Sequence, residues 1–535
     1  MIAQNINPVE TKEPQNRASE PVVSDVDLPM KSPMAKISDA EESEEEEWMY
    51  EPMIYIIEPY IEDIEQYRRG GHHPVHLEDM LNDRYEVWRK LGSGGFGNVW
   101  LCYDTSSKKW RAVKVMTADH SKRGREQKVY DQLRARASVE DLFEKHHLAV
   151  PLDEFWIDGP NGRHLCIVLP VFGKSLNVWE LLLSGLDEGT VAKKKDVCRK
   201  LTEAVRFLHH AGICHGDLKP QNVLLTLKGV EDMGKDELLE LIGEPDLYGV
   251  ERRNGKDPAP RAPEYIVAPP DHYWWRNFCD GSIAIIDFGE SFLVNDPPDE
   301  AAWSWPYAAP EILLPRQGIK QGINGYGSDI WSLATTIFEV REGHTLFNGD
   351  RRASVVHQIE VILGALPEPY LTEAVNTGLK CDEDEKLEER QSIIEGTGYS
   401  DPLEAVLGKE KLEYVEKPGE PCQTQASYRS DREEVLQLAD LLRKMLHYNP
   451  NKRISTDQVL KHPWMGGHTP FYMTLGLEVR KRVLLLFLIL AVCVAEIAFL
   501  LYTSFPWHFR PLMSFRTPNI VLHKDLPCQS FSDLM

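Results

Sequence analysis

Three polar side chains lie close together in the stretch CHGDLKPQNVLL, Cys214 to Leu225. Asp217 carries a carboxylate that can accept a proton, Lys219 a cation that can neutralise an anionic group, and Asn222 a carboxamide oxygen. An apolar run follows them. The alternative interpretation is a polar turn in which the aspartate caps a helix or closes the loop.

A second carboxylate, Asp287, stands at the end of the apolar stretch IAIIDFGES, which is typical of a buried strand. Asp287 and Asn222 offer the hard oxygen ligands that Mg²⁺ prefers, and such a pair leaves room for phosphate and water. Beside them, Asp217 would accept or orient a hydroxyl proton and Lys219 would neutralise a transferring phosphate.

Gly92, Gly94 and Gly97 follow the G-x-G-x-x-G spacing in LGSGGFGNVW. The same spacing opens dinucleotide-binding folds, but those folds need a helix after the third glycine, and here a Val-Trp-Leu strand follows. A glycine-rich hairpin instead lets backbone N–H groups close over phosphates without a side-chain clash.

Lys114 lies in the apolar strand RAVKVM. If it points inward it needs an anionic partner, because burial of an unpaired charge is costly. Glu126, on the following helical stretch, is the candidate, although Arg125 and Lys128 flank it. The alternative is a surface lysine on an edge strand and a surface glutamate on a helix.

The elements that would position these residues follow from periodicity. Strands are predicted at 85–92, 97–104 and 109–116, a charged helix at 122–137, and a hairpin at 152–159 and 164–170. The pattern then becomes helical, with Val197, Leu201, Val205 and Leu208 on one face and Gly212 at the end. A strand-rich half followed by a helical half predicts an α+β fold in two lobes.

The order of these motifs is a glycine hairpin, a strand lysine, a helix glutamate, H-x-D-x-K-x-x-N, D-F-G and then APE. In this order they resemble the signature set of eukaryotic protein kinases across residues 85–465. The resemblance implies a small antiparallel β-sheet lobe at 85–172 and a larger helical lobe at 173–465. It also implies transfer of the γ-phosphate of Mg·ATP to protein serine or threonine hydroxyls.

The resemblance assigns roles to single residues. Asp217 would be the catalytic base with Lys219 beside it, and Asn222 and Asp287 would hold Mg²⁺. Lys114 would hold the α- and β-phosphates and pair with Glu126. Asp329 would brace the catalytic loop, and Glu311 would pair with Arg453. The residues that would cover ATP or line its adenine pocket are Gly92, Gly94, Gly97, Val99, Ala112, Leu169 and Val171.

A finer resemblance covers residues 64–101, which are similar to the lead-in and first strands of SR-protein kinases of the fungal type. Those kinases phosphorylate serines in arginine–serine-rich splicing factors and carry a spacer inside the kinase domain, as residues 226–281 do here. The chain departs from them in its short spacer, in D-F-G where those kinases often carry Leu, and in Ala308 where related kinases carry Arg.

We therefore expect Arg/Ser-rich protein substrates. One alternative is a membrane-tethered Ser/Thr kinase with unrelated substrates. Another is a pseudokinase scaffold, against which the intact Lys114, Asp217, Asn222 and Asp287 argue.

Gly216 stands where many kinases carry an arginine that receives the phosphate of an activation-loop residue, and glycine cannot do so. The segment 287–311 offers few acceptors, chiefly Ser291 and Ser304, while acidic residues already give it negative charge. We therefore expect activity without activation-loop phosphorylation.

The net charge of −24 disfavours direct nucleic-acid binding and favours basic partners. Residues 1–70 carry 17 acidic and 6 basic residues, net −11, and residues 365–435 carry 18 and 8, net −10. The acidic run at 381–390 would dock Arg-rich substrates, or else is plain solvated surface. Nine cysteines without a C-x-x-C pair indicate a reduced protein, expected as a monomer in the cytoplasm, the nucleus or both.

The remaining predictions concern the outer segments. Residues 1–52 have the composition of a disordered acidic region, 53–84 form the lead-in, and 365–434 form an acidic, irregular insert. Residues 483–502 are apolar with one charge and follow a basic cluster, which predicts a membrane helix with the kinase domain on the cytoplasmic side. Residues 503–535 would form a tail. The alternative for 483–502 is a buried C-terminal helix or a faulty gene model.

Overall fold

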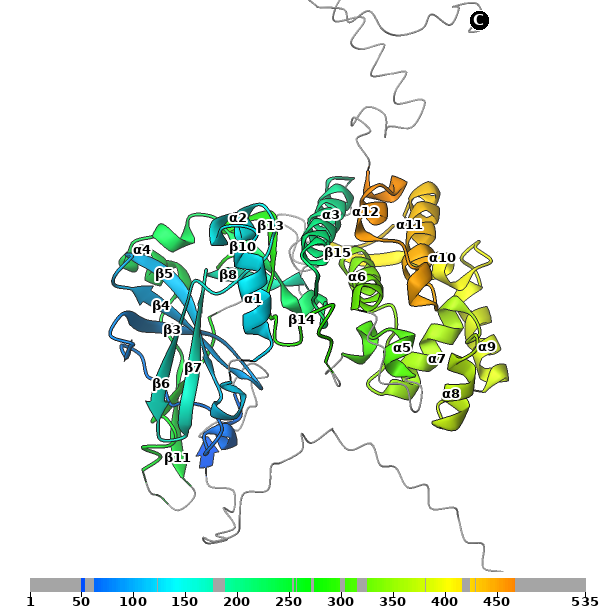
Figure 1. Ribbon diagram of the computed structural model, residues 1–535. Helices are drawn as coiled ribbons and strands as arrows, with labels where there is room; N and C mark the ends of the chain where they lie inside the picture. The colour runs from blue at the N-terminus through cyan, green and yellow to red at the C-terminus, as the bar shows by residue number, and fades with distance from the viewer. Residues whose placement is uncertain are drawn as a thin grey trace, which may run out of the picture. The chain divides into compact units, whose positions relative to one another are not determined.

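The computed structural model describes most of the kinase-like region (Figure 1). The described residues are 50–52, 62–122, 124–176, 188–252, 255, 257–270, 274–298, 304–314, 325–380, 382–415, 424–428 and 430–466. Residues 1–49, the membrane segment predicted at 483–502 and the tail at 503–535 lie outside them. Within the described residues, no helix is both long and apolar enough to cross a bilayer.

The small lobe is built on a six-stranded antiparallel sheet in the order β2-β3-β4-β5-β7-β6. Its strands are β2 Met80–Leu81, β3 Tyr85–Gly94, β4 Gly97–Asp104, β5 Lys109–Met116, β6 Asp153–Gly159 and β7 Gly162–Leu169. The strands predicted from alternation are therefore confirmed. Val87, Val113, Val115 and Val168 form part of the apolar core on one face of this sheet.

The helix predicted at 122–137 is shorter than expected and is followed by a second one. Helix α1 spans Glu126–Arg134 and α2 spans Val139–Glu144. Ser138 is extended and its Oγ accepts the backbone N–H of Asp141 at 3.1 Å, so it caps a new helix and separates the two.

The large lobe is helical, as predicted. Its longest helix, α3 Glu188–His210, buries Val197, Leu201, Val205 and Leu208 along one face, and Gly212 follows with φ +78°. Helix α6, Gly325–Glu342, is buried almost all round. Further helices of this lobe include α5 Pro310–Leu313, α7 Arg352–Leu363, α11 Arg432–Met445 and α12 Thr456–Leu460.

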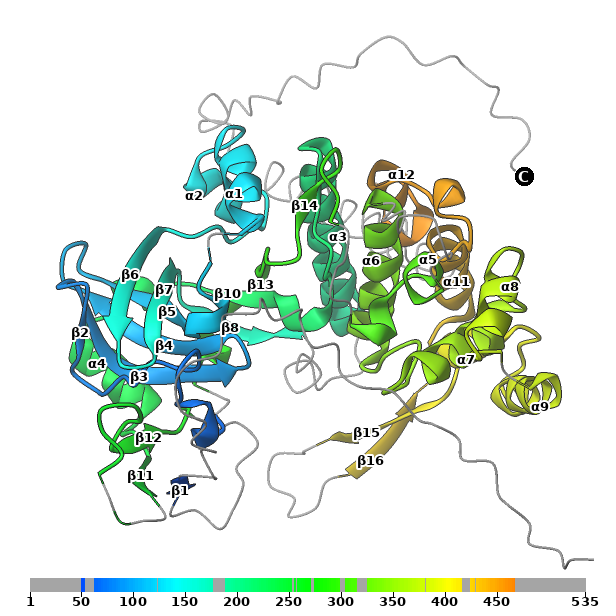
Figure 2. The ribbon, with the colours of Figure 1, turned by 60° about the horizontal axis from the view of Figure 1, so that its bottom comes forward.

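The acidic segment at 365–434 is not irregular, and that prediction was wrong. It contains α8 Tyr370–Asn376, α9 Glu383–Ile394 and α10 Pro402–Leu407 (Figure 1). It also contains a hairpin of β15 Lys411–Val415 with β16 Thr424–Tyr428 (Figure 2). Asp382 and Asp401 cap α9 and α10 through their carboxylates. Several of the acidic residues thus start helices, a use that the charge count did not reveal.

The insert predicted at 226–281 separates two strands of one hairpin, β10 Val223–Leu227 and β13 Cys279–Ile285. A third strand, β8 Phe172–Ser175, pairs with β10. The insert contains a 3₁₀ turn, Val230–Asp232, then α4 Lys235–Ile242, β11 Leu247–Arg252 and β12 Tyr265–Val267. Tyr50–Pro52, the end of the region predicted to be disordered, form strand β1 and pair with β11.

Helix α4 of the insert packs on the small lobe. Leu238 and Ile242 are buried against Leu101 and Trp110, and the Trp110 indole N–H donates to the Met233 carbonyl at 3.0 Å. A segment that follows the catalytic loop in sequence thereby completes an apolar cluster of the small lobe.

Candidate active site

The loop between β9 (Ile213–Cys214) and β10 brings Asp217, Lys219 and Asn222 together. Lys219 Nζ lies 2.6 Å from Asp217 Oδ2. The Asn222 side-chain amide, on a 3₁₀ turn that starts with Pro220, donates to the Asp217 carbonyl at 2.8 Å and to its Oδ2 at 3.0 Å. The aspartate is therefore held as an oriented carboxylate beside a cation, which suits a proton acceptor.

Ser304 completes this group, although motif reasoning considered it only as a phosphate acceptor. Lys219 Nζ donates to Ser304 Oγ at 2.8 Å, and Ser304 Oγ donates to Asp217 Oδ1 at 3.3 Å. The serine lies 87 positions beyond the aspartate. The available sequence signal was a hydroxyl residue shortly before the APE motif.

Asp329 braces the catalytic loop from the buried helix α6, as predicted. Its carboxylate accepts the backbone N–H groups of His215 at 2.8 Å and Gly216 at 3.0 Å, and contacts His209 Nε2 at 3.1 Å. Asp329 is only 1% exposed, so its carboxylate is hydrogen-bonded by protein groups and not by bulk water.

Glu311 and Arg453 form the predicted pair within the large lobe. Arg453 Nη1 and Nη2 donate to Glu311 Oε1 and Oε2 at 2.6 and 2.7 Å. This bidentate geometry ties the start of α5 to the segment before α12.

Gly216 adopts a conformation that only glycine accommodates readily. Its φ is +81°, and a Cβ would lie 2.4 Å from the Glu290 carbonyl oxygen. The residue therefore lets the catalytic loop pass close to the segment that follows Asp287.

We predict that Gly216→Ala is more harmful than Gly212→Ala. Gly212 also has a positive φ, +78°, but a Cβ at this position would meet no atom within 4 Å, so its substitution should cost only ~1 kcal/mol of backbone strain. Gly216→Ala should lose a further ~1–3 kcal/mol through the clash. Urea unfolding of both variants measures this difference, and equal losses would contradict the prediction.

Asp287 follows Ile286, the residue that lies opposite Asn222. Ile286, just before Asp287, donates its backbone N–H to the Asn222 carbonyl at 2.9 Å, which places the two predicted Mg²⁺ ligands on neighbouring strand ends. Asp287 has φ +63°, and its Oδ1 accepts the Gly289 N–H at 3.3 Å. The Asn222 amide nitrogen faces Asp217, which leaves its Oδ1 for a cation, so the donor set fits Mg²⁺.

The predicted nucleotide-binding residues share one face of the small-lobe sheet. Val99 pairs with Lys114 across β4 and β5, and Ala112 pairs with Leu169 across β5 and β7. Val171 follows in the connection to the large lobe and is buried. Paired positions and alternate positions of a strand point the same way, so the side chains of Val99, Ala112, Lys114 and Leu169 face one region.

Two of the three predicted phosphate-covering glycines have no packing reason to be glycine. A Cβ at Gly92 or Gly94 would meet no atom within 4 Å, whereas one at Gly97 would lie 2.3 Å from the Val115 carbonyl. Open space beside Gly92 and Gly94 fits backbone that must approach a phosphate closely.

The predicted ion pair between Lys114 and Glu126 is not formed. No ion pair of Lys114 occurs among the described residues, and Glu126 Oε1 instead accepts the Gly124 N–H at 3.3 Å. Glu126 is the first residue of α1, where free backbone N–H groups attract a carboxylate. The roles of both residues toward a nucleotide stay predictions.

Sequence reasoning gave no role to the lead-in clamp, which comprises Glu62, Tyr67, Lys90 and Asn98. Lys90, on β3 two residues before Gly92, is fully buried and forms an ion pair with Glu62, whose side chain is 3% exposed. Tyr67 donates to Glu62 at 2.7 Å, and the Asn98 amide donates to Tyr67 Oη at 3.3 Å. The clamp thus joins the lead-in to both strands of the glycine hairpin.

Burial shifts the protonation equilibria around this clamp. It lowers the pKa of Lys90, against the opposing effect of Glu62, and lowers the pKa of His73 to about 4. A neutral His73 packs beside His164 of β7, with ring centroids 4.9 Å apart. The lead-in is therefore integrated into the small-lobe core.

Comparison with known proteins agrees with this geometry. Serine/threonine-protein kinase spk-1 of Caenorhabditis briggsae is 36% identical over 173 residues, which are 32% of this chain and 15% of that protein. SRSF protein kinase 3 of Homo sapiens is 36% identical over 172 residues, 31% of this chain and 30% of that protein. Serine/threonine-protein kinase SRPK of Physarum polycephalum is 26% identical over 435 residues, 77% of this chain and 92% of that protein.

The spk-1 match is confined to a small part of a much longer protein, since this chain spans 15% of its length. The resemblance to SR-protein kinases is nevertheless confirmed by these relatives. The protein kinase domain family matches residues 85–240 and 276–465, and the gap between them falls inside the insert. With its catalytic loop, glycine hairpin and two lobes in the expected order, the chain belongs to the protein kinase domain family.

Proposed function

We propose that this protein is a serine/threonine kinase that transfers the γ-phosphate of ATP to serines of Arg/Ser-rich proteins. The arrangement of Asp217, Lys219 and Ser304 supports phosphoryl transfer, because it combines an oriented proton acceptor with a cation. The similarity to SR-protein kinases supports the substrate class. Asp217 would accept the proton of the substrate hydroxyl, and Lys219 would stabilise charge on the transferring phosphoryl group.

The remaining residues position the nucleotide. Backbone N–H groups of the glycine hairpin and Lys114 would hold its phosphates, and Asn222 with Asp287 would hold Mg²⁺, which neutralises phosphate charge when bound. Most of the catalysis in this reaction class comes from positioning and electrostatics, and the Asp217 loop would supply both.

The substrate class is tested with the full-length chain, labelled ATP, Mg²⁺ and two peptides. One peptide is an Arg-Ser repeat and the other is an acidic or proline-directed serine peptide, with Asp217→Ala as the blank. We expect label on the Arg-Ser peptide alone. Label on the other peptide alone would support kinase activity but contradict the proposed substrate class. No label above the blank would contradict kinase activity on these peptides.

We also propose activity without activation-loop phosphorylation. Ser291 Oγ is fully buried and donates to the His215 carbonyl at 2.7 Å, while Ser304 Oγ is engaged by Asp217 and Lys219. Phosphatase treatment should therefore leave kcat unchanged, whereas a loss of activity would contradict the proposal.

Ser304→Ala should lower kcat about tenfold through a lost charge-assisted hydrogen bond, and Ser304→Thr should retain activity.

Helix α9 is a candidate docking surface for Arg-rich substrates. Glu383 contacts Lys386 and Glu389 contacts His357, so these acids serve the fold. Asp384, Glu385 and Glu388 are exposed on the same helix. Reversing these three to lysine should raise KM for an Arg-Ser peptide and leave kcat unchanged, and an unchanged KM would refute this surface.

A further inference from the structure

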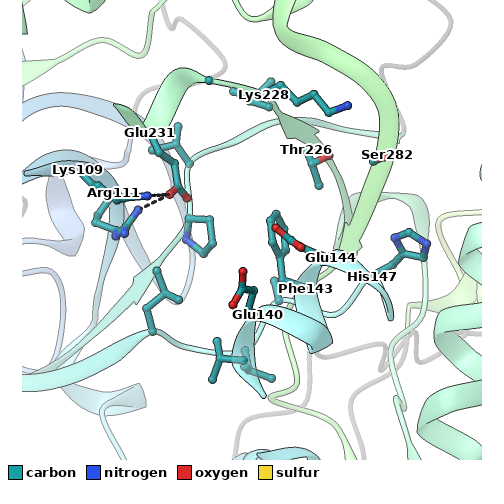
Figure 3. A pocket seen from close by; sticks show the side chains of 18 of the residues that line it. Lys109, Arg111, Glu140, Phe143, Glu144, His147, Thr226, Lys228, Glu231 and Ser282 are labelled. Carbon is teal, nitrogen blue, oxygen red and sulfur yellow. Dashed lines mark ion pairs between the residues drawn. The ribbon is translucent and has the colours of Figure 1, made fainter. Parts of the chain in front are cut away.

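A pocket of about 840 Å³ lies beside the connection between the lobes (Figure 3). Helix α2 forms one wall and the start of the insert forms the opposite wall, with Pro170 and Val171 between them. None of Lys114, Asp217, Lys219, Asn222 and Asp287 lines it. Its volume is in the range of sites that hold a drug-sized ligand.

The two charged walls of the pocket differ. On the insert side, Arg111 Nη1 lies 2.9 Å from Glu231, and Lys109 Nζ lies 3.2 Å from Asp232. On the α2 side, Glu140 and Glu144 form no ion pair with any described residue, and Figure 3 shows both carboxylates directed into the opening. Lys228 also lines the pocket, but its ammonium points away from the centre (Figure 3).

The cation next to the two glutamates, Lys145, interacts with both of them electrostatically, but its ammonium forms its ion pair with Asp141 at 2.7 Å. The two glutamates stand four residues apart on α2, where like charges repel each other and destabilise a helix by a few tenths of a kcal/mol. Glu140 in the first turn is favoured by the free N–H groups there, but Glu144 is the last residue of the helix, where a carboxylate is disfavoured. A bound cation would relieve both effects.

The surroundings of the carboxylates favour a guanidinium over an ammonium. Phe143 lies beside both glutamates on the same helix and lines the pocket (Figure 3), and its ring meets Phe172 edge-on at 5.8 Å. Leu152, Pro170 and Ile283 add apolar surface for an aliphatic stem. A planar guanidinium can stack on an aromatic face while it bonds carboxylates at its edge, which a compact, strongly hydrated ammonium does less well.

From these observations we infer that the pocket is a docking site for an arginine side chain of an Arg-rich protein substrate. The guanidinium bonds Glu140 and Glu144 and stacks on Phe143, and the stem lies on the apolar floor. This inference rests on the proposed function for its substrate class, and it places a second contact at a distance from the reacting serine. It is independent of the surface of α9.

Binding is tested with an Arg-Ala repeat peptide, which has no hydroxyl to phosphorylate, by fluorescence anisotropy with the full-length chain. The Glu140→Gln/Glu144→Gln variant should bind about tenfold or more weakly, because two hydrogen bonds to a charged group are lost. The matched control is Asp236→Asn/Glu240→Gln, which removes two exposed acids at the same spacing on α4 and should bind normally. Unchanged binding by the α2 variant, or equal binding of a Lys-Ala peptide by the wild type, would overturn the inference.

A kinetic measurement separates this inference from the proposed function. With a long Arg-Ser substrate, the Glu140→Gln/Glu144→Gln variant should raise KM about tenfold and leave kcat unchanged, whereas a short peptide that fills only the active site should show no change. If wild type labels both substrates and the variant has the same KM, the docking site is wrong and the kinase stands. If wild type labels neither but the anisotropy difference persists, the arginine site stands and the proposed function is wrong.

Discussion

Replacing Asp217 with asparagine should lower kcat for phosphoryl transfer about 10²–10⁴-fold, the range expected for a lost general base. Asparagine keeps an oxygen for the Asn222 amide but loses both the proton-accepting charge and the ion pair with Lys219, which is now 2.6 Å long. Nucleotide affinity should stay within a few fold, because neither the glycine hairpin nor Lys114 is altered. Single-turnover phosphorylation and binding of a fluorescent ATP analogue measure the two effects separately.

The control for this variant is Asp236→Asn on α4, which removes one exposed carboxylate away from the site. It should leave both kcat and nucleotide affinity unchanged. If Asp217→Asn kept more than one tenth of the wild-type kcat, the aspartate would not be the proton acceptor, and the catalytic loop would need another assignment.

Breaking the lead-in clamp should have the largest effect on stability. Glu62→Gln leaves the fully buried Lys90 ammonium without its anionic partner, and removing one partner of a buried pair costs about 3–5 kcal/mol. Because Lys90 stands two residues before Gly92, the same change should disturb the glycine hairpin and raise KM for ATP. Urea unfolding and steady-state kinetics measure the two consequences.

The double variant Glu62→Gln/Lys90→Met separates the charge from the packing. It removes both charges, so no buried charge is left unpaired, and it should recover most of the lost stability. Tyr67 can still hydrogen-bond the glutamine, which retains the contact with the lead-in. A double variant as unstable as Glu62→Gln alone would show that the ion pair is not what the single change disrupts.

Local pattern sufficed to predict much of the fold and the site. The start of β3 and most of β5 alternate buried and partly exposed residues, whereas β4 is buried at most positions. In the Asp217 loop, the contacting residues Lys219 and Asn222 lie within five positions of the aspartate. Such information lies within a few residues and is visible in the sequence. Asp329 and the Glu311–Arg453 pair were found only through resemblance to a family, since each contact spans more than 100 positions.

The missed features depend on distant or conformational information. Ser304 meets Asp217 across 87 positions, and Glu62 meets Lys90 through an arrangement of the lead-in that no periodicity reports. The predicted contact of Lys114 with Glu126 failed because the first residue of a helix has a competing backbone partner. In the acidic segment, the count of charges did not show that Asp382 and Asp401 cap helices.

The position of helix α4 has a consequence for biosynthesis. Leu238 and Ile242 complete a small-lobe cluster with Leu101 and Trp110, yet they are translated after the catalytic loop. A nascent chain that ended at the connection between the lobes would leave the side chains of Leu101 and Trp110 exposed to water. We therefore expect the small lobe to complete its core only after α4 has been synthesised, and an isolated fragment of residues 62–172 to be prone to aggregation.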